Sequence, residues 1–170
     1  ELAMHKSLGR TSVSAILVIG FMLSGCSTSV HLTRDFDKKA VQSTSIKEVT
    51  IRAKHLSGAT RRVLSNLKGA ILARLPKAAP SSKSPANLDV LVTRANFSNS
   101  TSRLLIGAFS GMDRLHVSVT LKDANSNKII TSFNVNGDYN PGGLGTFATP
   151  EKYTANNVAD AIVNKLYGTD

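Results

Sequence analysis

The sequence of 170 residues has little of what most metal and redox sites are built from. It contains one cysteine, no tryptophan, five prolines and only 5% aromatic residues. A single cysteine excludes an internal disulfide framework and any multi-cysteine zinc or iron–sulfur site. The four histidines are scattered along the chain, at His5, His31, His55 and His116. We therefore expect no metal site.

Catalytic motifs are equally scarce. There is no Gly-x-Ser-x-Gly nucleophile elbow, and the glycines at 142, 143 and 145 are not followed by the lysine of a phosphate-binding loop. His116 occupies one of the polar positions of an expected strand in which apolar and polar residues alternate. The remaining carboxylates are isolated and fit turns, helix starts and the surface: Asp113, Asp123, Asp138, Glu151 and Asp160. These absences favour a binding or structural protein over an enzyme.

The beginning of the chain carries the clearest pattern. Met4 is followed by the basic residues Lys6 and Arg10 and then by an apolar run over 13–23. A basic stretch, a short apolar run and small residues in that order predict a secretory signal peptide over residues 1–25. The run is too short for a comfortable transmembrane helix, which needs about 20 apolar residues.

The tetrad Leu23-Ser24-Gly25-Cys26 resembles the lipobox of bacterial lipoproteins. The resemblance implies cleavage before Cys26, diacylglycerol on its thiol, and an N-acyl chain such as palmitate on its amino group. We expect no other cofactor. An uncleaved membrane anchor with an ordinary thiol is the alternative. Ser27, where an Asp would retain the protein in the inner membrane, favours the periplasmic leaflet of the outer membrane, with inner-membrane retention as the alternative.

Three segments are expected along the chain. Residues 1–25 are the signal peptide, of which 1–3 are an upstream extension or cloning remnant. Residues 26–45, rich in Ser, Thr and charge, are expected to form a flexible tether that reaches roughly 60 Å when extended. Residues 46–170 are expected to fold as one periplasmic domain.

Hydrophobic periodicity within 46–170 predicts four strands and two helices. The strands are expected at 49–53, 88–97, 115–121 and 129–135, and the helices at 58–75 and 150–166. Pro76 ends the first helix, and Thr149 and Pro150 begin the second. Asp123–Lys128 is expected to be a hairpin turn, in which Asn tolerates left-handed backbone. The pattern predicts an α+β fold: a mostly antiparallel four-stranded sheet with two helices packed on one face, in the order β-α-β-β-β-α.

Positive charge is concentrated in the first half of the chain. Residues 34–103 contain fourteen Lys and Arg against four acidic residues, whereas residues 104–170 contain five against six. Four of the basic residues lie on or near the polar side of the first helix: Arg61, Arg62, Lys68 and Arg74. They either contact anionic phospholipid or lipopolysaccharide or form a solvated helix face. Nucleic acid is not an expected partner, because aromatic residues for stacking are too few.

A short apolar segment interrupts the polar region between two expected strands. Its residues are Leu104, Leu105, Ile106 and Phe109. Such a segment either forms an exposed loop that engages a partner or is buried at the edge of the sheet. We favour burial.

The stretch from Asn87 to Leu166 resembles a family of uncharacterised Gram-negative outer-membrane lipoproteins with a small α/β domain of unknown function. The resemblance rests on Arg103–Gly111, the strand at 115–121, the acidic turn at Asp123, a second strand, a Gly-rich loop and the last helix. Asn127 stands where such proteins often have Gly. The resemblance implies a periplasmic lipoprotein and brings no established activity.

Together these patterns predict a non-catalytic, lipid-anchored binding or accessory lipoprotein that faces the periplasm. Its expected partners are the membrane, through the lipid anchor, and an envelope protein. The alternative is an accessory subunit of an envelope transport or lipopolysaccharide-export assembly. A cell-wall or lipid-modifying enzyme is the rival from a different class.

Overall fold

The computed structural model describes residues 26–55, 57–76, 83–97, 112–139 and 149–168, so the expected signal peptide lies outside it. The strands are β1 (Cys26–Leu32), β2 (Thr44–Ala53), β3 (Ser84–Asn96), β4 (Asp113–Asp123) and β5 (Ile129–Tyr139). The helices are α1 (Lys38–Gln42), α2 (Gly58–Arg74) and α4 (Pro150–Tyr167).

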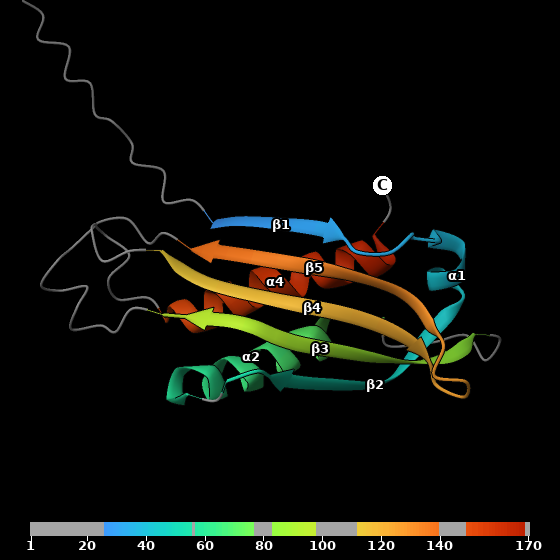
Figure 1. The fold of residues 1–170 in the computed structure, drawn as a ribbon, viewed down its shortest axis with the longest axis horizontal. Coiled ribbons are helices and arrows are strands. Elements are labelled where there is room, and N and C mark those ends of the chain that lie inside the picture. The colour runs from blue at the N-terminus through green and yellow to red at the C-terminus, as the bar shows by residue number, and fades with distance from the viewer. Residues whose placement is uncertain (1–25, 56, 77–82, 98–111, 140–148, 169–170) are drawn as a thin grey trace, which may run out of the picture.

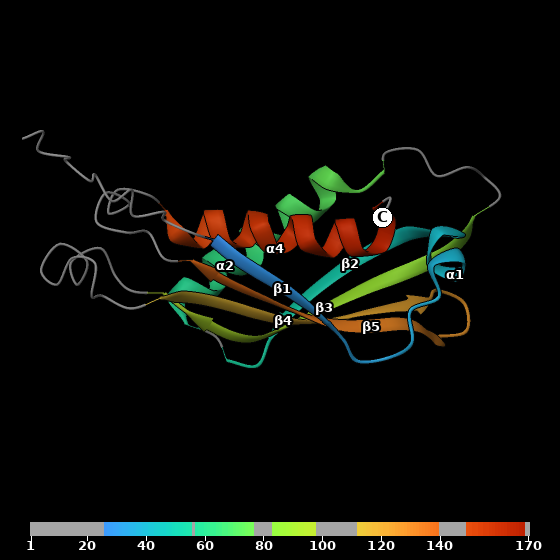
Figure 2. The ribbon, with the colours of Figure 1, turned by 90° about the horizontal axis from the view of Figure 1, so that it is seen from above.

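The strands form one sheet in the order β1-β5-β4-β3-β2. Strands β2 and β3 are parallel, and the other three pairings are antiparallel. Helices α2 and α4 lie side by side on one face of the sheet, as Figure 2 shows, and no helix of the described residues lies on the opposite face.

The predicted fold class is wrong. The sheet has five strands and is mixed, and the described residues include three helices. The parallel pair arises because α2 connects two neighbouring strands: after a helical crossover the chain re-enters the sheet in its original direction. The succession strand, helix, strand is visible in the sequence and is the local signal for this parallel pair.

The predicted tether is also wrong. Residues 26–32 form β1, which pairs antiparallel with β5 from Cys26↔Tyr139 to Leu32↔Phe133. The short helix α1 follows and is capped by Asp37, whose carboxylate accepts a hydrogen bond from the amide of Ala40 at 3.0 Å. As an edge strand β1 buries little apolar surface, and Val30 and Leu32 are exposed. It therefore lacks the apolar alternation by which a strand is recognised.

The helices and strands of the expected domain lie close to the predicted positions. Ser57 caps α2, and Arg74 is its last residue before Leu75 and Pro76. Along most of their length β3, β4 and β5 alternate between buried and half-buried positions. Leu67 and Ile71 of α2 and Ile162 of α4 are buried in a core that they share with β3, β4 and β5. The predicted phasing of both helices is confirmed.

The turn between β4 and β5 is also as predicted. Asn127 has a φ of 56°, in the left-handed region that Asn tolerates better than most residues. Asp123 Oδ1 accepts hydrogen bonds from the amide of Ser126 at 2.7 Å, from its hydroxyl at 2.8 Å and from the amide of Asn125 at 3.1 Å. The donors on Ser126, the backbone amide first, lower the pKa of the Asp123 carboxyl.

Replacing Asp123 by alanine is expected to destabilise the protein at neutral pH and to matter less in acid. The three donors favour the ionised carboxylate, so it stabilises the fold above its unfolded-state pKa. That contribution is lost as the pH falls through the lowered folded-state pKa. Urea denaturation of the wild type and of Asp123→Ala at neutral pH and at about pH 2 measures the difference. A stability gap of the same size at both pH values would contradict the role of the ionised carboxylate.

Candidate functional site

Cys26, the predicted lipid attachment residue, is the first residue of β1. Its register partner on β5 is Tyr139, which is in turn the partner of Asp113 on β4. These three residues therefore form one row across the sheet, at the end where β1 and β4 begin and β5 ends (Figure 1). The predicted attachment point belongs to the sheet itself.

Two of the four basic residues predicted to contact an anionic surface join α2 to α4. The guanidinium of Arg62 donates to Glu151 Oε1 at 2.9 Å, and Arg74 donates to both carboxylate oxygens of Asp160 at 2.5 and 3.3 Å. Part of their charge is therefore compensated within the domain. Arg61 and Lys68 are exposed. The contact with an anionic surface stays a prediction.

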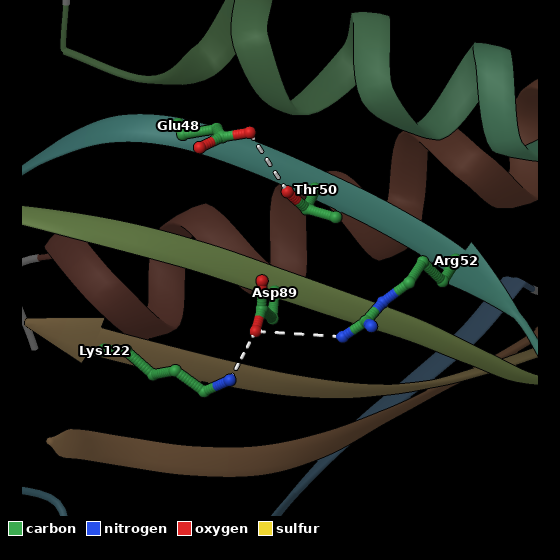
Figure 3. Close-up of polar contacts among 5 residues, drawn as sticks. All are labelled: Glu48, Thr50, Arg52, Asp89 and Lys122. Carbon is green, nitrogen blue, oxygen red and sulfur yellow. Dashed lines mark hydrogen bonds and ion pairs between the residues drawn. The ribbon is translucent and has the colours of Figure 1, made fainter. Parts of the chain in front are cut away.

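The face of the sheet without helices carries a cluster of charges around Asp89 on β3. Lys122 Nζ on β4 donates to Asp89 Oδ2 at 2.6 Å, and Arg52 on β2 lies 3.9 Å from the same oxygen. Figure 3 shows the two cations approaching the carboxylate from opposite sides. Through these two contacts Asp89 links the strands β2, β3 and β4.

Sequence reasoning missed this cluster, although a signal was present. Asp89 is the only acidic residue in β3 and is flanked by Leu88 and Val90. A lone carboxylate in an apolar strand indicates a cationic partner on a neighbouring strand, because an unpaired half-buried charge is costly.

A second group on the same face contains the one histidine of β4. His116 Nε2 lies 3.6 Å from Asp138 Oδ1, and Arg114 Nε lies 3.9 Å from that oxygen, which is buried and accepts no hydrogen bond from the described residues. A serine follows nearby on the strand, but Ser118 Oγ donates to Asn134 Oδ1 at 2.6 Å. The nearest hydroxyl along β4 is thus not directed at the imidazole, and the group does not form a Ser-His-Asp arrangement.

A cleft of about 460 Å³ lies beyond the carboxyl ends of the parallel strands β2 and β3. It is lined in part by His55, Ser57, Thr60 and Arg94. Ser57 Oγ accepts a hydrogen bond from the amide of Thr60 at 3.1 Å and so satisfies one donor at the start of α2. Beyond the carboxyl ends of parallel strands is a frequent position for ligands in α/β folds.

The predicted partner loop, with Leu104, Leu105, Ile106 and Phe109, lies outside the described residues. Within the part of the chain that the structure describes, no group of three or more His, Cys, Asp or Glu side chains is placed to hold a metal ion. No helix among the described residues is long and apolar enough to span a bilayer.

Residues 32–143 match the family model described as "Domain of unknown function (DUF4410)". The chain belongs to the DUF4410 family. The resemblance to a family with a domain of unknown function is thereby confirmed. In the DUF4410 chain the match extends well before Asn87 and includes β2 and α2.

Several solved structures resemble the DUF4410 chain, among them the following two. PelC of Paraburkholderia phytofirmans, solved as a dodecamer, aligns over 84% of this chain and 98% of its own, with 10% identity and a TM-score of 0.48. A Caulobacter crescentus CB15 protein, provisionally described as a lipoprotein, aligns over 76% of this chain and 90% of its own, with 13% identity and a TM-score of 0.39. No curated protein matches the chain by sequence.

Proposed function

We propose that the protein is a lipid-anchored accessory protein of the cell envelope that acts by binding. The carrying observation is that Cys26, directly after Leu23-Ser24-Gly25, is also the first residue of the folded sheet. A chain cleaved before Cys26 would keep every described strand and helix. The outer membrane, reached through the periplasm, is the proposed location.

Two features of the folded domain support binding over catalysis. No described helix covers the polar face of the sheet, since α2 and α4 lie on the opposite face (Figure 2), and this face could receive a partner. Its carboxylates Asp89 and Asp138 each lie within 4 Å of two basic side chains, Lys122 and Arg52 for the first, and His116 and Arg114 for the second. These contacts link neighbouring strands of the sheet, which gives the two carboxylates a structural role within a binding surface.

Metabolic labelling with a fatty-acid analogue tests the proposed anchor. The wild-type chain, expressed in a Gram-negative host, is expected to incorporate the label and to fractionate with membranes. The Cys26→Ala variant is expected to lose the label, because it lacks the thiol that receives diacylglycerol. A Ser24→Ala variant, which keeps a small residue before the cleavage site, is the matched control and should still be labelled. Equal labelling of the wild type and Cys26→Ala would refute the anchor.

A further inference from the structure

The end of the sheet that begins with Cys26 brings several residues together. Tyr139 on β5 is the register partner of Cys26, and Tyr153 in the first turns of α4 stacks on Tyr139 with a centroid distance of 6.1 Å and an interplanar angle of 9°. Met112 immediately precedes β4, whose first residue shares a row with Tyr139. We call this surface, made up of Cys26, Met112, Arg114, Tyr139, Lys152 and Tyr153, the anchor end.

Two of its large side chains are exposed. Tyr153 is 53% exposed and Met112 is 41% exposed, and Leu32 and Leu72 are exposed elsewhere on the domain. Tyrosine is enriched where hydrocarbon meets water at a membrane surface, because its ring is apolar and its hydroxyl is hydrated. An exposed tyrosine stacked beside the predicted acylation site is chemically suited to the phospholipid interface.

The charges near the anchor end are complementary to anionic headgroups. Lys152 is exposed and Arg114 is half-exposed. Arg61, near the start of α2, and Arg94, near the end of β3, are exposed as well. The acidic residues there are compensated or buried: Glu151 is paired with Arg62, Asp113 is buried, and Asp138 lies beside Arg114 and His116. Basic residues within a Debye length of an anionic bilayer are attracted to it.

Because Cys26 is the first residue of β1, no flexible tether separates the predicted lipid attachment site from the sheet. β1 pairs with β5 from its first residue, so acyl chains on Cys26 enter the bilayer directly from the end of the sheet. We infer that the anchor end lies against the phospholipid surface and that the strands and α4 extend away from it. This orientation rests on the proposed lipid anchor and specifies the surface that contacts the membrane.

Tryptophan fluorescence in vesicles tests the orientation, and the chain has no tryptophan that would contribute background. The acylated mature protein, which begins at Cys26, is reconstituted into anionic phosphatidylglycerol–phosphatidylethanolamine vesicles, with or without lipids brominated near the headgroup. Tyr153→Trp and Met112→Trp are independent reporters at the anchor end. Ile129→Trp is the matched control, since Ile129 begins β5 and lies about 34 Å along the strand from Tyr139.

At least a twofold quenching of both anchor-end tryptophans, together with an unquenched Ile129→Trp, supports the orientation. Two reporter positions are used so that one of them still reports the orientation if the other variant does not fold. Protein that floats with the vesicles but shows equal quenching at all three positions, or none at any, overturns the orientation alone. Protein that does not float overturns the proposed anchor, and the orientation with it.

Discussion

Replacing Ile71 by alanine is expected to lower the free energy of unfolding by about 2–5 kcal/mol. Ile71 lies on the inner face of α2 and is 0% exposed, in the core between the helices and the sheet. Its truncation removes buried apolar surface and leaves a cavity that the packed strands fill only in part. Urea denaturation of the chain without residues 1–25, with Cys26 replaced by serine, measures the loss.

Leu72 provides a control at the next position of the same helix. Its side chain is 51% exposed, so Leu72→Ala changes the same number of atoms without opening a buried cavity. Its effect is expected to stay within about 0.5 kcal/mol, the usual range for surface substitutions. Similar losses for the two variants would contradict the packing of α2 on the sheet.

Replacing Gly137 by alanine is expected to destabilise the protein by about 1–3 kcal/mol. α4 packs closely over β5 at this position, and a Cβ on Gly137 would lie 2.5 Å from Val158 Cγ2 and 3.3 Å from Thr154 Cγ2. Real Cβ atoms do not approach other carbons so closely, so α4 would have to move away from the sheet. The midpoint of urea denaturation measures the effect.

Two further variants isolate the steric cause. Val158→Ala removes the atom that the new Cβ would meet, so Gly137→Ala should cost less in a Val158→Ala background. Gly69→Ala makes the same substitution in α2, where no atom lies within 4 Å of the new Cβ. It is expected to stabilise the protein by about 0.5–1 kcal/mol, because alanine favours a helix interior over glycine. Destabilisation by Gly69→Ala and none by Gly137→Ala would refute the close packing of α4.

The elements predicted correctly are those whose signals are local. Ser57 and Pro76 bound α2, and the alternation from Leu115 to Leu121 marks β4 with one buried face. Asn127 signals the left-handed turn within the hairpin. Each of these depends on the backbone preferences or the periodicity of a few consecutive residues, which are written in the sequence.

The candidate site was predictable only in part. Cys26 stands out because it is the only cysteine and follows an apolar run, whereas its row with Tyr139 and Asp113 depends on how distant strands pair. The four basic residues of α2 look alike in the sequence. The structure distinguishes them, because α4 brings Glu151 to Arg62 and Asp160 to Arg74.

The sequence by itself determined α2 and α4, the strands β2 to β5, the hairpin turn and most of the apolar residues that these elements bury. Only the tertiary structure decided that residues 26–32 form a fifth strand and that β2 and β3 run parallel. The physical reason is that an edge strand is stabilised by backbone hydrogen bonds to a neighbour, here β5, and these bonds are insensitive to side-chain type. The segment after Cys26 thus becomes ordered through a partner more than 100 residues away in the chain, which no local pattern encodes.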